Sequence, residues 1–216
     1  MRNSLIDTVK FSIKVEHGSL IDEHKRLQAQ GVSNRLTNAM AGSSRKFKVP
    51  GAYGMEATVW SKKNGKVLQI ECSAAKFLRG HNVFGSEDLS QIVLDISKQV
   101  CQYLKIEPTP REKQAIKAGD VRLFRADLAA HFRLPSKFTV RSFQLALKMQ
   151  LAFTQRSFST YADETLYVNQ HSDMRPIKIY GKGEEIAFRP LPQNLPDREA
   201  IENYAKNLVR IEITLR

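Results

Sequence analysis

The stretch Leu208-Val-Arg-Ile-Glu-Ile-Thr-Leu215 alternates apolar and polar side chains. A period of two is typical of a β-strand with one face in the core, because successive side chains point to opposite sides of the sheet. The polar face of this strand carries Arg210, Glu212 and Thr214. The end of the chain is therefore expected to be a strand that displays charged groups on one side.

Three other segments share this pattern. In Val121–His131 one face carries Arg125, Asp127 and His131, and in Val67–Cys72 it carries Gln69 and Glu71. The segment Ile177–Lys182 is expected to place Lys178, Tyr180 and Lys182 together, opposite two isoleucines. Four strands that are distant in sequence thus offer acids, cations and a phenol on one side of the pleat.

The remaining elements predict the fold class. Strands are expected over 7–15 and 165–168, and Asn64-Gly65 favours a hairpin turn within 56–72. Apolar residues at helical spacing predict helices over 20–29, over 86–104 with Ser86 as its cap, from 135 onward and over 197–207. Residues 35–54 and 108–119 are expected to be loops or connections. This order favours an α+β fold, with an antiparallel sheet and helices mainly on one face, in a single domain of residues 1–216.

The charge of the chain points to a polyanionic partner. The 216 residues carry a formal net charge of +12, and the windows 25–55 and 128–162 hold eleven basic residues and no acid. Nucleic acid fits such windows better than a membrane, since glycines and a proline interrupt the first window and no apolar run is long enough to span a bilayer. A solvated surface of a basic protein is the alternative. Two cysteines without metal-ligand spacing favour a reducing cytosol.

The three acids Glu71, Asp127 and Glu212 would form an oxygen-only site if their strands meet, and such a site suits Mg²⁺ or Mn²⁺. A phenol beside it can attack phosphorus, although only about 0.1% of an ordinary tyrosine is ionised at neutral pH. The alternative is a solvated sheet face with salt-bridged acids and bases. His131 is a weak candidate ligand, because four residues of extended strand separate it from Asp127 by about 13 Å.

One stretch carries a family resemblance. The run Glu71-Cys-Ser-Ala-Ala-Lys-Phe-Leu-Arg-Gly-His-Asn-Val-Phe-Gly-Ser86 resembles the Glu-x-x-Ala-x-x-Lys-x-Leu-x-Gly-His-Asn-Val-Phe-Gly stretch of the replication initiation protein II/X family of filamentous phages. The short motifs at Arg125-Ala-Asp127, Tyr180-Gly-Lys182 and Leu208-Val-Arg-Ile-Glu212 follow in the order of that family. The resemblance covers residues 67 to 216.

The resemblance implies a rolling-circle replication initiator with a fold similar to Rep and relaxase-type endonuclease domains. Such a protein nicks one DNA strand at an origin through a covalent 5′-phosphotyrosine and later rejoins it. Tyr180 would be the nucleophile, with Lys182, Arg125 and Arg210 as cationic neighbours. Glu71, Asp127 and Glu212 would hold the Mg²⁺ or Mn²⁺ ion.

The expected partner is the origin DNA of a phage or plasmid replicative form, in the cytoplasm of a bacterial host. The residues expected to contact DNA are Lys76, His81, Asn82, Arg45, Lys46, Lys48, Arg133 and Lys137. A host replication helicase and polymerase are further candidate partners, and the chain is expected to be the nicking domain alone, without the C-terminal region of the family.

Three alternatives stay open. The chain could have this fold and bind origin DNA as a regulator without chemistry, or it could be an RNA-binding sheet module. Tyr161, Tyr167 and Tyr204 are rivals of Tyr180 as the nucleophile, and Tyr161 or Tyr167 could act as a second acceptor.

Overall fold

The computed structural model describes residues 3–18, 46–154, 157–161, 165–170 and 175–216. Its contacts divide into two compact units. We call Met1–Asp7, His81–Glu87 and Arg125–Arg216 the C-terminal unit, and Thr8–Gly80 with Asp88–Phe124 the N-terminal unit. The strands β1 (Asn3–Lys14) and β5 (Arg122–Arg133) contribute residues to both units. That residues 1–216 form a single domain stays a prediction.

The N-terminal unit contains an antiparallel sheet in the order β2-β3-β4-β1. Its other strands are β2 (Lys46–Pro50), β3 (Glu56–Lys62) and β4 (Val67–Ser73). The hairpin predicted within 56–72 is confirmed, and its turn has positive φ angles at Lys63, Asn64 and Gly65. The prediction of a loop over 35–54 was wrong in part, because β2 and the short 3-10 helix Ala52–Gly54 lie in it.

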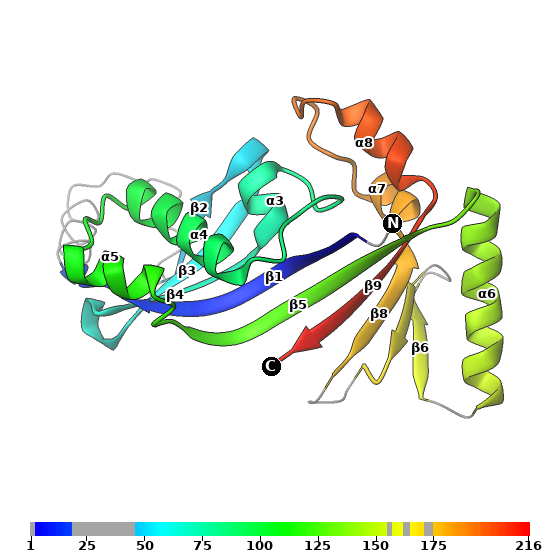
Figure 1. The fold of residues 1–216 in the computed structure, drawn as a ribbon, viewed down its shortest axis with the longest axis horizontal. Coiled ribbons are helices and arrows are strands. Elements are labelled where there is room, and N and C mark those ends of the chain that lie inside the picture. Colours follow the sequence, from blue (N-terminus) through cyan, green and yellow to red (C-terminus); the bar gives the residue numbers. More distant parts are fainter. Residues whose placement is uncertain (1–2, 19–45, 155–156, 162–164, 171–174) are drawn as a thin grey trace, which may run out of the picture. The chain divides into compact units, whose positions relative to one another are not determined.

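Helices cover one face of this sheet, where strand residues such as Phe11, Val59 and Ile70 are fully buried. In Figure 1 they lie on one side of β1–β4: α3 (Ala74–Arg79), α4 (Leu89–Tyr103) and α5 (Pro110–Lys117). The expected cap of α4 was wrong, since Asp88 and not Ser86 accepts the backbone N–H of Gln91. The helix α5, which begins at a capping box, replaces the connection predicted for 108–119.

The C-terminal unit contains five antiparallel strands in the order β5-β9-β8-β7-β6. The strands not yet bounded are β6 (Phe158–Tyr161), β7 (Thr165–Val168), β8 (Ile177–Gly181) and β9 (Leu208–Leu215). One sheet face is apolar and packs against α6 (Lys137–Phe153), where Val140 joins Leu166, Ile179 and Val209. Ser136 caps α6 as its position before the helix predicts.

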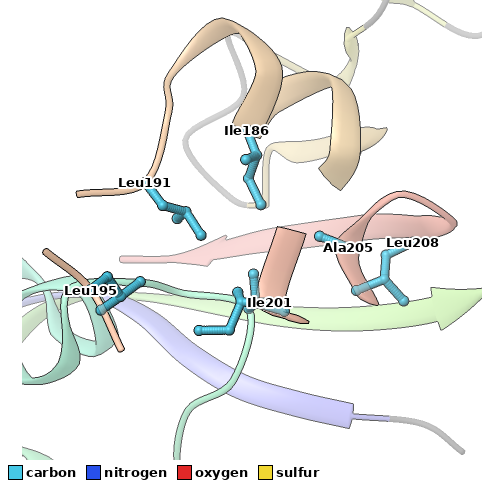
Figure 2. Close-up of a cluster of buried hydrophobic side chains, with 7 residues drawn as sticks. Ile186, Leu191, Leu195, Ile201, Ala205 and Leu208 are labelled. Carbon is cyan, nitrogen blue, oxygen red and sulfur yellow. The ribbon is translucent and has the colours of Figure 1, made fainter. Parts of the chain in front are cut away.

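A second layer of helices lies over one end of the other face. The helix α7 (Lys182–Phe188) directly follows β8, and α8 (Arg198–Ala205) leads into β9. Figure 2 shows the cluster beneath them, in which Ile186, Leu191 and Ile201 lie close to Leu208. The expectation that Lys182 belongs to the strand was wrong, because it is the first residue of α7.

The structure confirms the α+β class and the antiparallel pairing of the sheet strands. The helix expected over 20–29 lies outside the described residues. Within the described part of the chain, none of the helices is both long and apolar enough to cross a membrane.

Candidate functional site

Strand register gathers the polar side chains of the C-terminal unit on one face of its sheet. Tyr180 lies opposite Arg210, and Arg210 lies opposite His131, so one row of side chains crosses three strands. In the next row Lys178 lies opposite Glu212. Asp127 is a diagonal neighbour of Glu212, which places their Cβ atoms about 7 Å apart. The predicted nucleophile Tyr180 and two of the three predicted metal ligands, Asp127 and Glu212, therefore share a sheet face.

Tyr180 is hydrogen-bonded to the carboxylate predicted as a metal ligand. Its hydroxyl donates to Oε1 of Glu212 at 2.7 Å, and only 3% of the residue is exposed. Burial raises the pKa of the phenol well above its ordinary value. The charge of Arg210 lowers this pKa and that of Glu212 raises it further. In this conformation Tyr180 is a neutral hydrogen-bond donor.

Arg210 is the centre of the polar network and is completely buried. Its Nε donates to Oε1 of Glu212 at 2.6 Å, and its Nη2 lies 3.0 Å from Oδ1 of Asp7. Its Nη1 donates to the backbone oxygen of Asn82 at 2.6 Å. Although burial lowers it, the pKa of the guanidinium is raised above its ordinary value, chiefly by the charge of Asp7. Two carboxylates thus balance one buried cation.

His131 belongs to this network as a neutral acceptor. Its Nε2 lies 3.1 Å from Nη1 of Arg210, which can only donate, so the proton of the ring resides on Nδ1. Burial lowers the pKa of His131 to about 3, and the charges of Arg210 and Lys182 act in the same direction. Its ring is therefore uncharged at neutral pH, and the ring nitrogen that could bind a metal is already engaged.

The Gly-His-Asn-Val-Phe-Gly run, residues 80–85, lies outside the sheet and is hydrogen-bonded to the network through Asn82. The side chain of Asn82 donates to Oδ1 of Asp7 at 2.8 Å and accepts from Nζ of Lys182 at 2.7 Å. Lys182 is 1% exposed and also pairs with Glu185. His81 stacks edge-on against Phe84. Both His81 and Asn82 are buried, and Asn82 holds the network together by its contacts with Asp7, Lys182 and Arg210. The contact of both residues with DNA stays a prediction.

Two further cations lie beside the acids of the sheet face. Arg125 forms a two-pronged ion pair with Asp127, with contacts of 2.8 and 2.5 Å. Nζ of Lys178 lies 4.2 Å from the centre of the Tyr180 ring and 3.8 Å from Oε2 of Glu212. Lys178 stood out from the sequence only as a member of a polar face, and its position against the phenol required the register.

Glu71, the third predicted metal ligand, belongs to the N-terminal unit. It lies on the polar face of that sheet, in register with Lys10 and Thr58, and its Oε2 is 3.0 Å from Nζ of Lys10. Among the residues that the structure describes, no group of three His, Cys, Asp or Glu side chains is placed to hold a metal ion together. The donor chemistry of Asp127 and Glu212 fits a hard divalent cation, but each carboxylate is paired with a cationic side chain.

A cavity of about 210 Å³ opens beside Tyr180. Tyr161, Tyr167 and Tyr180 all line it, and their strands place them on the same sheet face. Tyr161 is 68% exposed. Burial raises the pKa of Tyr167, and the charge of nearby Glu212 raises it further. The two rivals on β6 and β7 therefore adjoin the predicted nucleophile, whereas Tyr204 lies on α8 and packs against Phe84.

The other predicted DNA contacts divide between the two units. Lys48, Arg133 and Lys137 are exposed, Lys76 is half-buried, and Arg133 lies over the ring of Tyr204. Arg45 and the side chain of Lys46 lie outside what the structure describes. Sequence reasoning missed Asp7 and Glu185 as members of the network. Asp7 is the first residue of the strand predicted over 7–15, and nothing in the alternating pattern connects it with Arg210.

The arrangement defines an α+β protein with a buried tyrosine, carboxylate and arginine network on a sheet face. Residues 5–216 match the family model of the N-terminal region of the phage replication-associated protein, the gene II protein, so the chain belongs to this family. The replication-associated gene II protein of Enterobacteria phage I2-2 is 28% identical over 177 residues, covering 78% of this chain. The match spans 51% of the relative, so the chain spans about half its length. The predicted family is confirmed.

Proposed function

We propose that this chain is a replication initiator that nicks one strand of origin DNA and rejoins it, with Tyr180 as the nucleophile. The observation that carries the proposal is the 2.7 Å hydrogen bond from the Tyr180 hydroxyl to Glu212, on the polar face of a chain of this replication-protein family. An acceptor at this distance can take the phenolic proton as the oxygen becomes a nucleophile.

The reaction exchanges one phosphoester for another. The Tyr180 oxygen forms a bond to the phosphorus, its proton passes to Glu212, and the bond from phosphorus to the 3′ oxygen breaks. The 3′ oxygen keeps the electron pair and takes up a proton, so that a 3′-hydroxyl and a 5′-phosphotyrosine result. Rejoining runs the same exchange in reverse, and the energy of the phosphoester is retained throughout.

The cations of the network fit this chemistry. Lys178 against the Tyr180 ring and Arg210 beside Glu212 favour the phenolate form of Tyr180. Burial of the side chain by itself disfavours this charged form. Asp127 and Glu212, with Glu71 as the third predicted ligand, would hold Mg²⁺ or Mn²⁺, and the ion would polarise the phosphodiester and neutralise charge that develops on it. Arg125 would have to release Asp127 for this purpose.

A regulator that binds origin DNA without chemistry is the second candidate. The observation that favours it is the 3% exposure of Tyr180 together with its raised pKa, because a buried neutral phenol cannot reach a phosphate without a rearrangement.

Adduct formation separates the two candidates. The chain is incubated with labelled single-stranded origin DNA and Mn²⁺, and covalent protein–DNA complexes are resolved under denaturing conditions. Tyr180→Phe should bind DNA as the native chain does and form no adduct, whereas Tyr103→Phe, on an exposed face of α4, should form adducts normally. Adducts that persist in Tyr180→Phe would move the nucleophile to Tyr161 or Tyr167. A native chain that binds DNA and forms none would favour the regulator.

Substitution of Asp127 by Asn tests the predicted ion. The change keeps the shape of the side chain and removes one charge from the polar face, so metal-dependent adduct formation should fall by at least 100-fold while DNA affinity stays equal or rises. Unchanged adduct formation would remove Asp127 from the ligand set.

A further inference from the structure

A second cation-rich site lies in the N-terminal unit. A groove of about 730 Å³ is bordered by the end of β1, the turn between β3 and β4, and the start of β5. Among the described residues that line it, the basic ones are Lys14, Lys62, Lys63, Lys66 and Arg122, and the acidic one is Asp120. All of these residues belong to the same unit. None of the five cations was singled out by the sequence patterns.

The positive charge of the groove is poorly balanced. Asp120 lies 3.3 Å from Lys14, and both side chains are largely exposed. Lys62, Lys63 and Lys66 form no ion pair with any residue in the described part of the chain. All three side chains are exposed and lie in or next to one tight turn. Their positive charges repel one another, and the binding of an anion relieves this repulsion.

One aromatic ring lines the groove, and a second lies on the same face of β3 as Lys62. Phe124 lines it, and the guanidinium of Arg122 lies 4.9 Å from the centre of that ring. Trp60 lies two residues before Lys62 on β3, on the same face of the strand, and opposite Gln69, which also lines the groove. Nζ of Lys10 lies 5.1 Å from the centre of the Trp60 ring. The face thus combines a row of cations with flat apolar surfaces.

The helices of the described part of this unit pack on the opposite face of the sheet, where Val59, Leu68 and Ile70 are buried. The groove face instead carries half-buried or exposed residues, most of them polar, among them Ser12, Lys62 and Gln69. Cations that track a phosphate backbone beside rings on which bases stack are the two features by which proteins hold single strands.

We propose that this groove binds single-stranded DNA, with phosphates along Lys62, Lys63, Lys66 and Arg122 and with bases against Phe124 and Trp60. The site involves no residue of the tyrosine network, so it does not rest on the nicking reaction. In this proposal the N-terminal unit holds a melted DNA strand.

The intrinsic fluorescence of Trp60 provides a direct assay, since Trp60 is the sole tryptophan of the chain. An oligonucleotide of ten thymidines is titrated into the full chain between 50 and 200 mM salt, without a divalent ion. If the four proposed cations contact phosphates, the slope of log affinity against log salt is about −2.8, and affinity falls about 50-fold over this range. Lys62→Ala with Lys66→Ala should reduce the slope to about −1.4 and the fall to about 7-fold.

The matched control is Lys98→Ala with Lys117→Ala, which removes the same charge from the exposed surfaces of α4 and α5 and should keep the native slope. Phe124→Ala should weaken binding by roughly 5- to 100-fold, because the stacking contribution is lost. Far-UV circular dichroism confirms that each variant is folded before titration.

Three results would overturn the proposal. Equal effects of the two lysine pairs would show that only the overall charge matters. Heparin that quenches Trp60 as strongly as the oligonucleotide, together with an unaffected Phe124→Ala, would reduce the groove to an anion surface. A ten-base-pair duplex that binds more tightly than the single strand would assign the groove to duplex DNA. Absence of adducts in the tyrosine assay would leave all of these outcomes unchanged.

Discussion

Replacing Arg210 with methionine removes the one fully buried guanidinium of the polar network and leaves a side chain of similar volume. Asp7 and Glu212 then lose their shared cation, at contacts of 3.0 and 2.6 Å. The removal of one partner from a buried ion pair costs about 3–5 kcal/mol, because the other charge stays buried without compensation. For a chain of this size such a loss lowers the melting temperature by roughly 6–20 °C.

The matched control is Arg198→Met on α8. Arg198 pairs with Glu202 at 2.7 Å, but about a third of each side chain is exposed. A surface pair of this kind contributes about 0–1 kcal/mol, so the melting temperature should change by less than about 3 °C. Adding Asp7→Asn to Arg210→Met should restore part of the lost stability, since one of the two uncompensated acids becomes neutral.

Thermal melts followed by far-UV circular dichroism and by Trp60 fluorescence measure these effects in both units. Arg210 lies in the C-terminal unit and Trp60 in the N-terminal unit. If the chain is the single domain that the sequence predicts, both probes shift together. A shift in circular dichroism without a shift in fluorescence would mean that the units unfold separately. An Arg210→Met melt within about 3 °C of Arg198→Met would refute the network as a source of stability.

Three other predictions follow from buried groups. The pKa of His131 is about 3 when folded and near 6.5 when unfolded, so the unfolded state binds the extra proton and stability falls as pH drops below 6.5. Urea unfolding at pH 6.5 and 4.5 should show about 2 kcal/mol more loss for the native chain than for His131→Gln, and equal losses would contradict the buried neutral ring. Gly51→Ala should cost about 1–3 kcal/mol, because the new Cβ would lie 2.5 Å from the backbone oxygen of Phe77. A Cβ at Gly18 would meet no atom of the described residues within 4 Å, so Gly18→Ala should be neutral, and equal melting temperatures of the two variants would refute the close approach. Burial raises the pKa of Cys101 to about 11, so a thiol reagent at pH 8 should leave it unmodified until the chain is unfolded, and rapid labelling of the native chain would contradict this.

The sequence predicts the sheet strands well because alternation is a local signal. The strand at 165–168 has the predicted bounds, and so has the terminal strand that begins at Leu208. The helix from Lys137 and the Asn64-Gly65 turn are also local, since a cap and a positive φ are set by a few neighbouring residues. Local rules fail at α7, where a helix begins without a break after β8. Gly181 permits this junction, because a Cβ there would meet Glu184 and Val140.

The sequence predicted on which sheet face each site residue lies, but not which side chain it pairs with. Alternation alone places Tyr180, Arg210 and Glu212 on polar faces, and the register then sets them side by side. That this face is buried could not be read from the strands, because α7 and α8, which follow β8 and precede β9, lie over one end of it. Charged side chains on a buried face have to be paired with groups of opposite charge. The acids that sequence chemistry assigns to a metal are therefore engaged by arginine and lysine side chains here.

This burial links the stability of the fold to the proposed reaction. Glu212 accepts from both Tyr180 and Arg210, so a phosphate that approaches Tyr180 competes for the same hydrogen-bonding groups that hold β8 and β9 together. A movement of Arg210 away from the network would leave Asp7 without its cation. Asp7 is also hydrogen-bonded to Asn82, which in turn accepts from Lys182, so these residues would be disturbed as well. Opening at Tyr180 is therefore easier from the cavity side, where Tyr161 and Tyr167 border it, than from the Asn82 side. The phenol is expected to reach DNA through that cavity while Arg210, Asp7 and Asn82 remain in place.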